Sequence, residues 1–536
     1  MNQAKYIFVT GGVVSSLGKG IISASIGKLL QARGYRITIQ KFDPYINIDP
    51  GTLNPYEHGE CYVTEDGCET DLDLGHYERF TDIRTSTANN VTTGKVYQAV
   101  IERERKGGYL GRTIQVVPHI TDEIKRRMLR LGATGDYDFI ITEIGGTVGD
   151  IEGLPFLEAV RQLKWELGDD AVCVHLTYVP YIAAAGELKT KPSQHSVKEL
   201  QGLGLQPDVL VLRSDRELGR GLLDKVGHFC NVEKDCVIQS IDLPSIYEVP
   251  IKMAEQNLDA VILRKFGMTC DNPLELDAWK KFIRRREQAS KEVDIALVGK
   301  YDLQDAYKSI LECLSQAATY NDCKVRTHFI QSEYLTHSNI GDSLSGMDGV
   351  VICPGFGQRG TEGKIIAAEY CRTHDIPTFG ICLGMQIMVI EFARNVLGLE
   401  DANSSEMDPK STNHVIDLME EQKNITQMGG TMRLGAYSCE LSIGSRAYDA
   451  YGRSPVKERH RHRYEFSNPY RRQFEQAGML CTGVNPESGV VEIVEVPACR
   501  WYVGVQFHPE YTGTVLNPNP LFMAFVRSAV GSSANQ

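Results

Sequence analysis

The stretch Tyr6-Ile-Phe-Val-Thr10, followed by Gly11-Gly-Val-Val-Ser-Ser-Leu-Gly-Lys-Gly20 and then by 21–31, decides the fold of the first half of this chain. The first five residues are apolar and β-prone, which predicts a buried strand. The glycines predict a turn, and 21–31 has amphipathic helical spacing that stops before Gly34. A strand, a glycine-rich loop and a helix in this order indicate an α/β fold whose loop could hold phosphate through backbone amides and a lysine.

This loop differs from the usual P-loop pattern, Gly-x4-Gly-Lys-Ser/Thr. The spacing from Gly12 to Gly18 is one residue longer, and Gly20 replaces the hydroxyl that normally holds magnesium. A plain glycine-rich turn therefore stays an alternative. If the loop binds a nucleotide, magnesium needs oxygen ligands from elsewhere, and the acids at 69–73 and Glu143, which ends an apolar strand, are the candidates.

Strand and helix patterns alternate along the whole chain of 536 residues, which is too long for one ordinary core. We expect two doubly wound, mostly parallel sheets. The predicted domains are 1–268 and 292–536, joined by a charged helical linker at 269–291. The predicted strands are 139–142, 171–177, 208–212, 293–298, 349–353 and 377–381, and 404–423 is predicted to be a polar excursion.

A thiol site is predicted in the second half. Gly380-Ile-Cys382-Leu-Gly384 follows a short apolar strand and fits a nucleophile elbow, in which glycines permit a sharp strand-to-helix turn. His508 and Glu510 lie two residues apart on an apparent strand that begins with Tyr502-Val-Gly-Val-Gln-Phe507, so we expect both side chains on the same face. An acid that orients a histidine, which in turn activates a cysteine, is the arrangement of a nucleophilic enzyme.

The composition limits the function classes. Hydrophobic residues make up 42% and charged residues 24%, as in a soluble globular protein. The net charge of -12 argues against nonspecific nucleic-acid binding, so no nucleic-acid partner is expected. The 14 cysteines lack paired metal-type spacing and fit a reducing compartment. Without a signal peptide or a long apolar run, we expect a cytoplasmic protein and no membrane partner.

Two further loops are candidate ligand sites. The stretch 42–52, followed by 58–60, has too many turn residues for a regular element and is better interpreted as a loop shaped around a ligand. Lys189-Thr-Lys191-Pro-Ser-Gln194 could bind a second polyanion through two lysines and small polar donors. An ordinary surface loop is the alternative there.

The thiol constellation resembles class I glutamine amidotransferases, whose thiolate attacks a glutamine side-chain amide and liberates ammonia. The chain as a whole resembles the CTP synthase family. The most specific stretches for this resemblance are 9–20, Asp43-Pro-Tyr-Ile-Asn-Ile-Asp-Pro-Gly51, Thr64-Glu-Asp-Gly67, 71–80 and 143–156. The resemblance implies a P-loop-like synthase domain followed by a class I glutamine amidotransferase domain.

The resemblance also implies the activity, a step of pyrimidine biosynthesis. ATP would phosphorylate the 4-oxygen of UTP, and ammonia released from glutamine would displace phosphate to give CTP, after moving through an internal passage. Mg²⁺ is the implied cofactor, GTP an activator and CTP an inhibitor. Members of the family are usually homotetramers and can form filaments.

The roles of individual residues are carried over from the family. The implied ATP site comprises Ser16, Leu17, Gly18, Lys19, Gly20, Ile21, Asp73, Ile241, Asp242 and Leu243, and the implied metal ligands are Asp73 and Glu143. The implied UTP and CTP contacts are Ser15, Asp150, Ile151, Glu152, Lys189, Thr190, Lys191, Pro192, Ser193, Gln194 and Lys225. In the second half, Cys382, His508 and Glu510 are the implied catalytic residues, and Gly355, Leu383, Gly384, Met385, Gln386, Glu406 and Arg463 the implied glutamine contacts. Lys41 is a candidate catalytic lysine, Leu110 a lid residue and Arg359 a candidate GTP contact.

Two alternatives stay open at this point. One is another glutamine-dependent amidoligase of similar build, such as a cobyrinate-type enzyme, and a panel of acceptor substrates distinguishes it. The other is a catalytically silent filament-forming or regulatory relative. The presence of Cys382, His508, Glu510 and Lys19 argues against a silent protein.

Overall fold

A computed structural model describes residues 4–418 and 432–533. The chain forms two compact units, each built from two pieces of sequence. The first unit runs to Pro50 and resumes over Asp73–Ile283, and the second combines Gly51–Leu72 with the chain from Arg284 onward. The sequence assigned 51–72 to the first domain, whereas its contacts assign it to the second unit. The predicted domain boundaries at 268 and 292 stay predictions.

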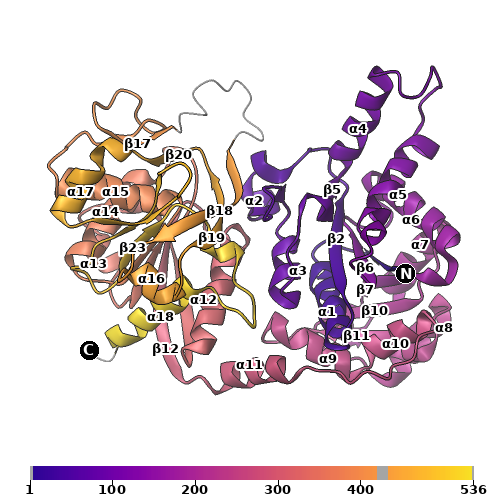
Figure 1. Cartoon of the computed structure of the whole chain (residues 1–536). Coiled ribbons are helices and arrows are strands. Elements are labelled where there is room, and N and C mark those ends of the chain that lie inside the picture. The colour runs from indigo at the N-terminus through magenta and orange to yellow at the C-terminus, as the bar shows by residue number, and fades with distance from the viewer. Residues whose placement is uncertain (1–3, 419–431, 534–536) are drawn as a thin grey trace. The chain divides into compact units, whose positions relative to one another are not determined.

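The first unit contains a seven-stranded sheet among its described residues, and neighbouring strands in it are parallel (Figure 1). Its apolar strands are buried on both faces, as expected of a doubly wound sheet. Its carboxyl edge carries the glycine-rich loop after β1 and the loop after β6. In spatial order the strands are β11 (Val237–Ile241), β10 (Val209–Ser214), β7 (Ala171–Tyr178), β1 (Lys5–Gly11), β6 (Phe139–Ile144), β2 (Ile37–Asp43) and β5 (Asn90–Thr92).

Helices cover both faces of this sheet (Figure 1). On one side α1, α3 and α9 pack together, and on the other α4 to α7 cover a continuous apolar core. The helices are α1 (Lys19–Ala32), α3 (Asp73–Thr81), α4 (Thr93–Arg105), α5 (Thr121–Arg130), α6 (Leu154–Leu167), α7 (Lys191–Gly202), α8 (Arg220–Cys230), α9 (Val249–Glu255), α10 (Leu258–Lys265) and α11 (Asp277–Gln288). The predicted linker helix is α11, and its Trp279 is buried against Phe80 and Tyr247.

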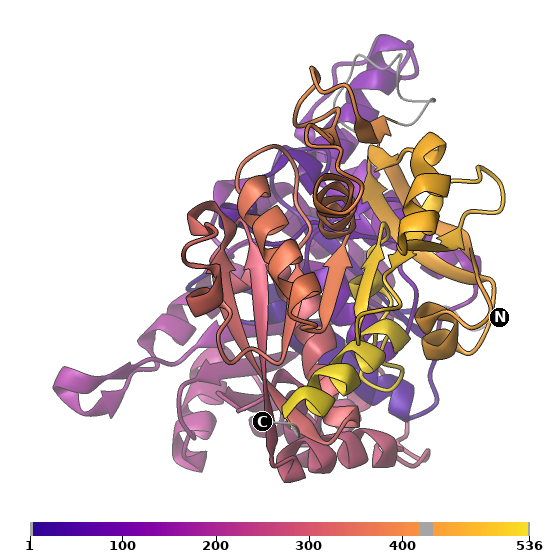
Figure 2. The ribbon, with the colours of Figure 1, turned by 90° about the vertical axis from the view of Figure 1, so that its left-hand side faces the viewer.

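The second unit contains a nine-stranded mixed sheet among its described residues. Figure 2, which turns this unit toward the viewer, shows its strands side by side. Strands β13 to β23 of the order below are parallel, and the pairs from β23 to β19 are antiparallel, so the sheet is less parallel than the sequence predicted. The order is β13 (Cys323–Gln331), β12 (Lys291–Gly299), β14 (Gly349–Ile352), β15 (Thr378–Ile381), β23 (Tyr502–Val505), β22 (Val491–Glu495), β21 (Leu480–Val484), β18 (Arg433–Leu441) and β19 (Val456–His462).

Seven helices contribute buried side chains to the core of the second unit, within its described residues. They are α12 (Lys308–Tyr320), α13 (Ile340–Ser343), α14 (Thr361–Thr373), α15 (Leu383–Asn395), α16 (Arg446–Tyr451), α17 (Arg471–Ala477) and α18 (Pro520–Ser533). The predicted excursion 404–423 begins with β16 (Asn403–Ser404) and contains β17 (His414–Leu418), which pairs with β20 (Tyr464–Phe466). Its last residues, 419–423, lie outside the described residues.

The segment 51–72 packs firmly into the second unit. It contains the short helix α2 (Pro55–His58) and the hairpin β3 (Tyr62–Val63) and β4 (Glu69–Thr70). The Arg461 guanidinium donates to the buried Glu69 carboxylate at 2.8 Å, and Arg459 donates to the Val63 carbonyl at 2.9 Å. These buried contacts join residues almost 400 positions apart in the sequence.

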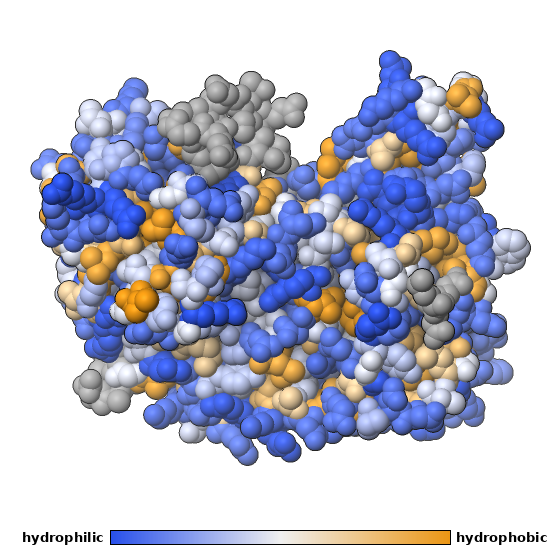
Figure 3. Space-filling model, viewed as in Figure 1, coloured by the Kyte–Doolittle hydropathy of each residue, from blue (hydrophilic) through white to orange (hydrophobic). Residues whose placement is uncertain are grey.

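Within the described residues, every helix is too short or too polar to cross a lipid bilayer. The face of the molecule drawn in Figure 3 is mostly hydrophilic, with apolar side chains scattered among polar ones.

Candidate functional site

The predicted elbow forms around Cys382, between β15 and α15. Cys382 has a positive φ of 52°, a strained conformation for a residue with a side chain. A Cβ on Gly384 would lie 2.0 Å from the Ile352 carbonyl oxygen, so only glycine fits there. The Leu383 N–H opens the helix, where a backbone donor has no partner within the helix. The fold therefore presents the thiol at the N-terminus of α15, beside the Leu383 N–H.

His508 and Glu510 are joined as predicted, but by a different element. Strand β23 ends at Val505, and His508 precedes the 3-10 turn Pro509–Tyr511 instead of lying on a strand. The turn brings the Glu510 Oε1 atom to 2.7 Å from the His508 Nδ1 atom. Although burial lowers the pKa of His508, the Glu510 carboxylate and the Cys382 sulfur raise it to about 10. The histidine is thus held as an imidazolium between an acid and a thiol.

A pocket of about 200 Å³ opens at Cys382 within the second unit. One wall is the catalytic constellation, and a second wall comes from the segment 51–61. Arg461 lines the pocket and lies over the Phe356 ring, 4.9 Å from its centroid. The lining residues named in the sequence prediction are Gly355, Cys382, His508 and Glu510.

The other predicted glutamine contacts surround the elbow. The Glu406 Oε1 atom accepts a hydrogen bond from the Gly357 N–H at 2.9 Å. Burial raises the pKa of the Tyr464 phenol, and the Glu406 carboxylate adds to this rise while the Arg463 guanidinium opposes it. Both charged side chains therefore lie near Tyr464. Gln386 is buried and donates to the Tyr464 carbonyl at 2.9 Å. Gly384 and Met385 are packed in the core beneath the turn.

The predicted phosphate loop and acids meet at the carboxyl edge of the first sheet. A Cβ on Gly20 would lie 2.2 Å from Asp73 Oδ1, so the missing side chain leaves space for a carboxylate where a usual P-loop has a hydroxyl. Lys41 forms an ion pair with Asp73, and Lys19 donates to the Gly146 carbonyl at 2.7 Å. The glycine-rich loop at 11–20 and the Asp73 carboxylate therefore lie together at one site.

The residues at this edge suit a hard divalent cation. Burial raises the pKa of Glu143 to about 8, with Asp73 adding to the rise while Lys41 and Lys19 oppose it. Two carboxylates that interact in a buried place favour a bound cation between or beside them, and their oxygen atoms are the ligands that Mg²⁺ prefers. Asp73 and Glu143 thus fit the predicted metal.

An apolar pocket of about 90 Å³ lies beside the glycine-rich loop. It brings together residues predicted for one ligand from two distant stretches: Leu17, Gly18, Ile21, Ile241 and Leu243. Asp242 forms an ion pair with Arg213, which also lines the pocket. The pocket therefore suits a flat, apolar ring of a ligand whose phosphates are bound by the neighbouring glycine-rich loop.

The predicted UTP loop begins α7. Gln194 donates to the Thr190 hydroxyl at 3.1 Å, and Ser193 donates to the Tyr178 carbonyl at 2.8 Å, so the small polar residues hold the turn itself. Lys189 pairs with Glu187 and lowers its pKa, and Lys225 lowers it further, which puts both lysines near one carboxylate. Among the described residues, no hydrogen bond or ion pair joins this loop to the exposed turn of Asp150, Ile151 and Glu152.

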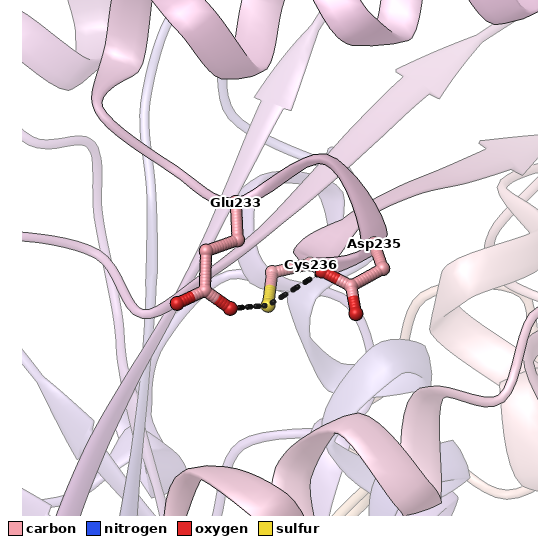
Figure 4. A group of neighbouring side chains, drawn as sticks. All are labelled: Glu233, Asp235 and Cys236. Atoms are coloured by element: carbon pink, nitrogen blue, oxygen red, sulfur yellow. Dashed lines mark hydrogen bonds between the residues drawn. The ribbon is translucent and has the colours of Figure 1, made fainter.

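A different acidic group could suggest a metal site but is already neutralised. The side-chain atoms of Glu233, Asp235 and Cys236 lie within 4.8 Å of one another, and Figure 4 shows both carboxylates pointing at the sulfur. Arg264 pairs with Asp235, and Lys265 lies 3.2 Å from Glu233. The basic side chains of α10 thus take the place of a cation.

Two features escaped the sequence prediction. Lys300 is buried and donates to the carbonyls of Phe356 and Gly357, beside the predicted Gly355 contact, and burial lowers its pKa to about 8. The wall supplied by 51–61 belongs to a stretch that was predicted to wrap a ligand, but in the other domain. Neither a lone lysine nor a turn-rich loop carries a sequence signal for a partner so distant.

Comparisons with known proteins agree with this architecture. Residues 5–268 match the family model of the CTP synthase N-terminus, and residues 302–528 match that of class-I glutamine amidotransferases. The CTP synthase of Bacteroides thetaiotaomicron is 67% identical over 537 residues, covering 100% of both chains, and that of Porphyromonas gingivalis ATCC 33277 is 64% identical, covering 99% of this chain and 98% of its own. A solved glutaminase domain of Trypanosoma brucei CTPS with bound acivicin is 38% identical, with a TM-score of 0.43, and covers 45% of this chain and 94% of its own.

Two family models together span most of the chain, and the similarity to the curated relatives extends over its full length. The chain belongs to the CTP synthase family of glutamine-hydrolysing ligases.

Proposed function

We propose that this protein makes CTP from UTP, with ATP as the phosphoryl donor and glutamine as the nitrogen source. Phosphate transfer to the 4-oxygen of uracil turns a poor leaving group into a good one, and ammonia then displaces it. The products are CTP, ADP, phosphate and glutamate. The observation that carries this proposal is the joining of Cys382, His508 and Glu510 on one pocket within a chain of this family.

The proposed glutaminase step uses Cys382 as the nucleophile. The His508 imidazolium and the Cys382 thiolate form the reactive pair, and His508 later protonates the departing ammonia. Glu510 holds the imidazole by its Nδ1 atom, so that the Nε2 atom remains for the sulfur and the leaving group. The Leu383 N–H and the Gly355 N–H would stabilise the oxyanion, and Glu406 and Arg463 have charges that complement the α-amino and α-carboxylate groups of glutamine.

The proposed synthase step uses the carboxyl edge of the first sheet. The loop Ser16 to Ile21 would hold the phosphates of ATP, with its adenine in the pocket of Ile241 and Leu243. Asp73 and Glu143 would hold Mg²⁺, which neutralises phosphate charge when bound. Lys19 and Lys41 supply positive charge where the phosphoryl group moves.

UTP and the inhibitor CTP carry the same triphosphate, so one basic loop can serve both. Support comes from Lys189 and Lys225, which approach one carboxylate that a triphosphate would replace. The exposed turn Asp150–Glu152 would contribute from another subunit of a homotetramer. Ile151 is 79% exposed and Trp165 84% exposed, which suits burial in such an interface.

GTP is proposed to activate the glutaminase half. The cations Arg359 and Arg461 near the aromatic rings of Tyr301 and Phe356 suit a purine nucleotide. A reducing, cytoplasmic setting fits cysteines that form no disulfide in the described part of the chain.

The first test separates the two halves. Cys382→Ala is expected to reduce glutamine-driven CTP formation by at least about a thousandfold, because the thiol is the nucleophile. Ammonium-driven formation should stay within about twofold of the wild type, since that chemistry needs no thiol. Both rates are measured as CTP formed from UTP, ATP and Mg²⁺. A variant that folds but loses both activities would contradict the division of labour.

A further inference from the structure

The side chain of Gln506 reaches the sulfur of Cys382. Its Nε2 atom lies 3.7 Å from the Sγ atom, and Gln506 is 1% exposed. In the thiol form, the sulfur can donate to the Arg461 carbonyl, which lies 3.7 Å away. A thiolate has no proton for that carbonyl, so it loses this bond while an N–H donor remains favourable. The Gln506 amide is such a donor.

The direction of the Gln506 amide is decided by its neighbours. The Tyr464 carbonyl can only accept a hydrogen bond, and Gln386 Nε2 donates to it at 2.9 Å. The same Nε2 group donates to Gln506 Oε1 at 3.2 Å. With its oxygen facing Gln386, Gln506 must present its NH₂ group to Cys382. Reversing the Gln386 amide would place its oxygen against the Tyr464 carbonyl oxygen, and reversing the Gln506 amide would place two NH₂ groups against each other.

The same carbonyl fixes a pair of buried histidines. His462 Nδ1 lies 3.0 Å from the Tyr464 oxygen and must be the protonated nitrogen. His462 Nε2 is then an acceptor, and His460 Nδ1 donates to it at 2.9 Å. Burial lowers the pKa of both histidines well below its usual value, so the pair is neutral. Neutral, directed hydrogen bonds thus hold Tyr464 and the strand β19 behind the thiol.

We propose that Gln506 is a catalytic residue that stabilises the Cys382 thiolate through its amide N–H, and that Gln386 and His462 are positioning residues that set the direction of this donor through the Tyr464 carbonyl. This inference rests on the proposed role of Cys382 as the nucleophile. Two charged groups also act on the sulfur: His508, from the turn after β23, and Lys364, from α14. Both of these charged groups stay in the protein when the Gln506 amide is replaced.

Alkylation by iodoacetamide tests the proposal, because it needs the thiolate but neither an oxyanion hole nor glutamine. The full-length protein is alkylated from pH 5 to pH 9, and the rate at Cys382 is followed by peptide mass spectrometry. Gln506→Leu is expected to slow alkylation about ten- to a hundredfold at neutral pH, the factor for one hydrogen bond to a charged group, with the wild-type rate regained at high pH. Gln506→Glu, which keeps the shape of the side chain but adds negative charge, should shift the pH dependence of alkylation to still higher pH. Gln386→Met should also shift the pH dependence of alkylation to higher pH, but by less than Gln506→Leu.

Gln316→Leu is the matched control, since it removes a buried amide from α12 of the same unit, outside the pocket. Its alkylation profile should coincide with that of the wild type. Ammonium-driven CTP formation reports whether each variant is folded, and if Gln506→Leu does not fold, the isosteric Gln506→Glu decides. Loss of glutamine hydrolysis in the Gln506 variants with an unchanged alkylation profile would overturn the inference. Glutamine hydrolysis that survives Cys382→Ala would instead overturn the proposed function itself.

Discussion

At the scale of single residues, the glutaminase centre depends on an unusual charge state. His508 is buried yet holds its proton, because Glu510 and the Cys382 sulfur outweigh the effect of burial on its pKa. The sequence predicted all three residues, since the elbow glycines and the His-x-Glu spacing are local signals. It could not predict Gln506 as a donor to sulfur, because the direction of an amide is set by Gln386 and Tyr464, which only the fold brings near.

This charge state predicts how stability changes with pH. The folded-state pKa of His508 lies near 10, above the ordinary value of 6.5. The ion pair therefore contributes its full stability below pH 6.5 and loses it as the pH rises toward 10. Glu510→Gln should be less stable than the wild type by a few kcal/mol, roughly, at pH 6.5, and the gap should close toward pH 10. Urea unfolding of both proteins at a series of pH values measures this difference in the free energy of unfolding. A difference that widens as the pH rises would contradict a protonated His508 paired with Glu510.

At the scale of elements, the junctions between strands and helices carry the chemistry. The strands and most helices were predictable because buried apolar runs and amphipathic repeats are local patterns. The strand predicted for His508 was wrong, because the chain leaves β23 at Val505 and turns at Pro509. The antiparallel half of the second sheet was missed as well, because its strands lack the apolar runs that marked the parallel ones; β19, for example, has the mostly polar sequence Val-Lys-Glu-Arg-His-Arg-His.

The junction of β1 and α1 yields a second prediction. Gly20→Ala should reduce CTP formation from both nitrogen sources at least about tenfold, because the new Cβ would lie 2.2 Å from Asp73 Oδ1 and displace a proposed metal ligand. Glutamine hydrolysis measured as glutamate release should persist. Gly221→Ala on α8 is the matched control, since a Cβ there meets nothing within 4 Å. Equal activities of the two variants would show that Asp73 needs no such space.

At the scale of the whole molecule, the two units are not consecutive halves of the sequence. The segment 51–72 belongs by its contacts to the second unit, although both of its neighbours in the chain belong to the first. No sequence pattern could predict this, because Glu69 and Arg461 carry ordinary charges and only become a buried pair in the fold.

A fragment that starts at residue 284 should therefore be an incomplete glutaminase unit. Without Glu69, the guanidinium of Arg461 loses its carboxylate partner, a loss of about 3–5 kcal/mol for a buried pair. We expect faster amide hydrogen exchange in β19 of the fragment than in the full chain, with protection restored by an added peptide of residues 51–72. Identical exchange in the fragment and the full chain would mean that the segment contributes nothing to this unit.

The path of residues 51–72 also limits how this enzyme can be recombined. A gene cut at the obvious boundary near residue 284 and joined to the glutaminase of a relative would leave the native segment facing a foreign pocket. Leu72 and Asp73 are joined by one peptide bond, so a graft that replaces the segment must end immediately before a proposed metal ligand. The interchangeable parts of this chain consist of two pieces each, and a successful chimaera has to carry both.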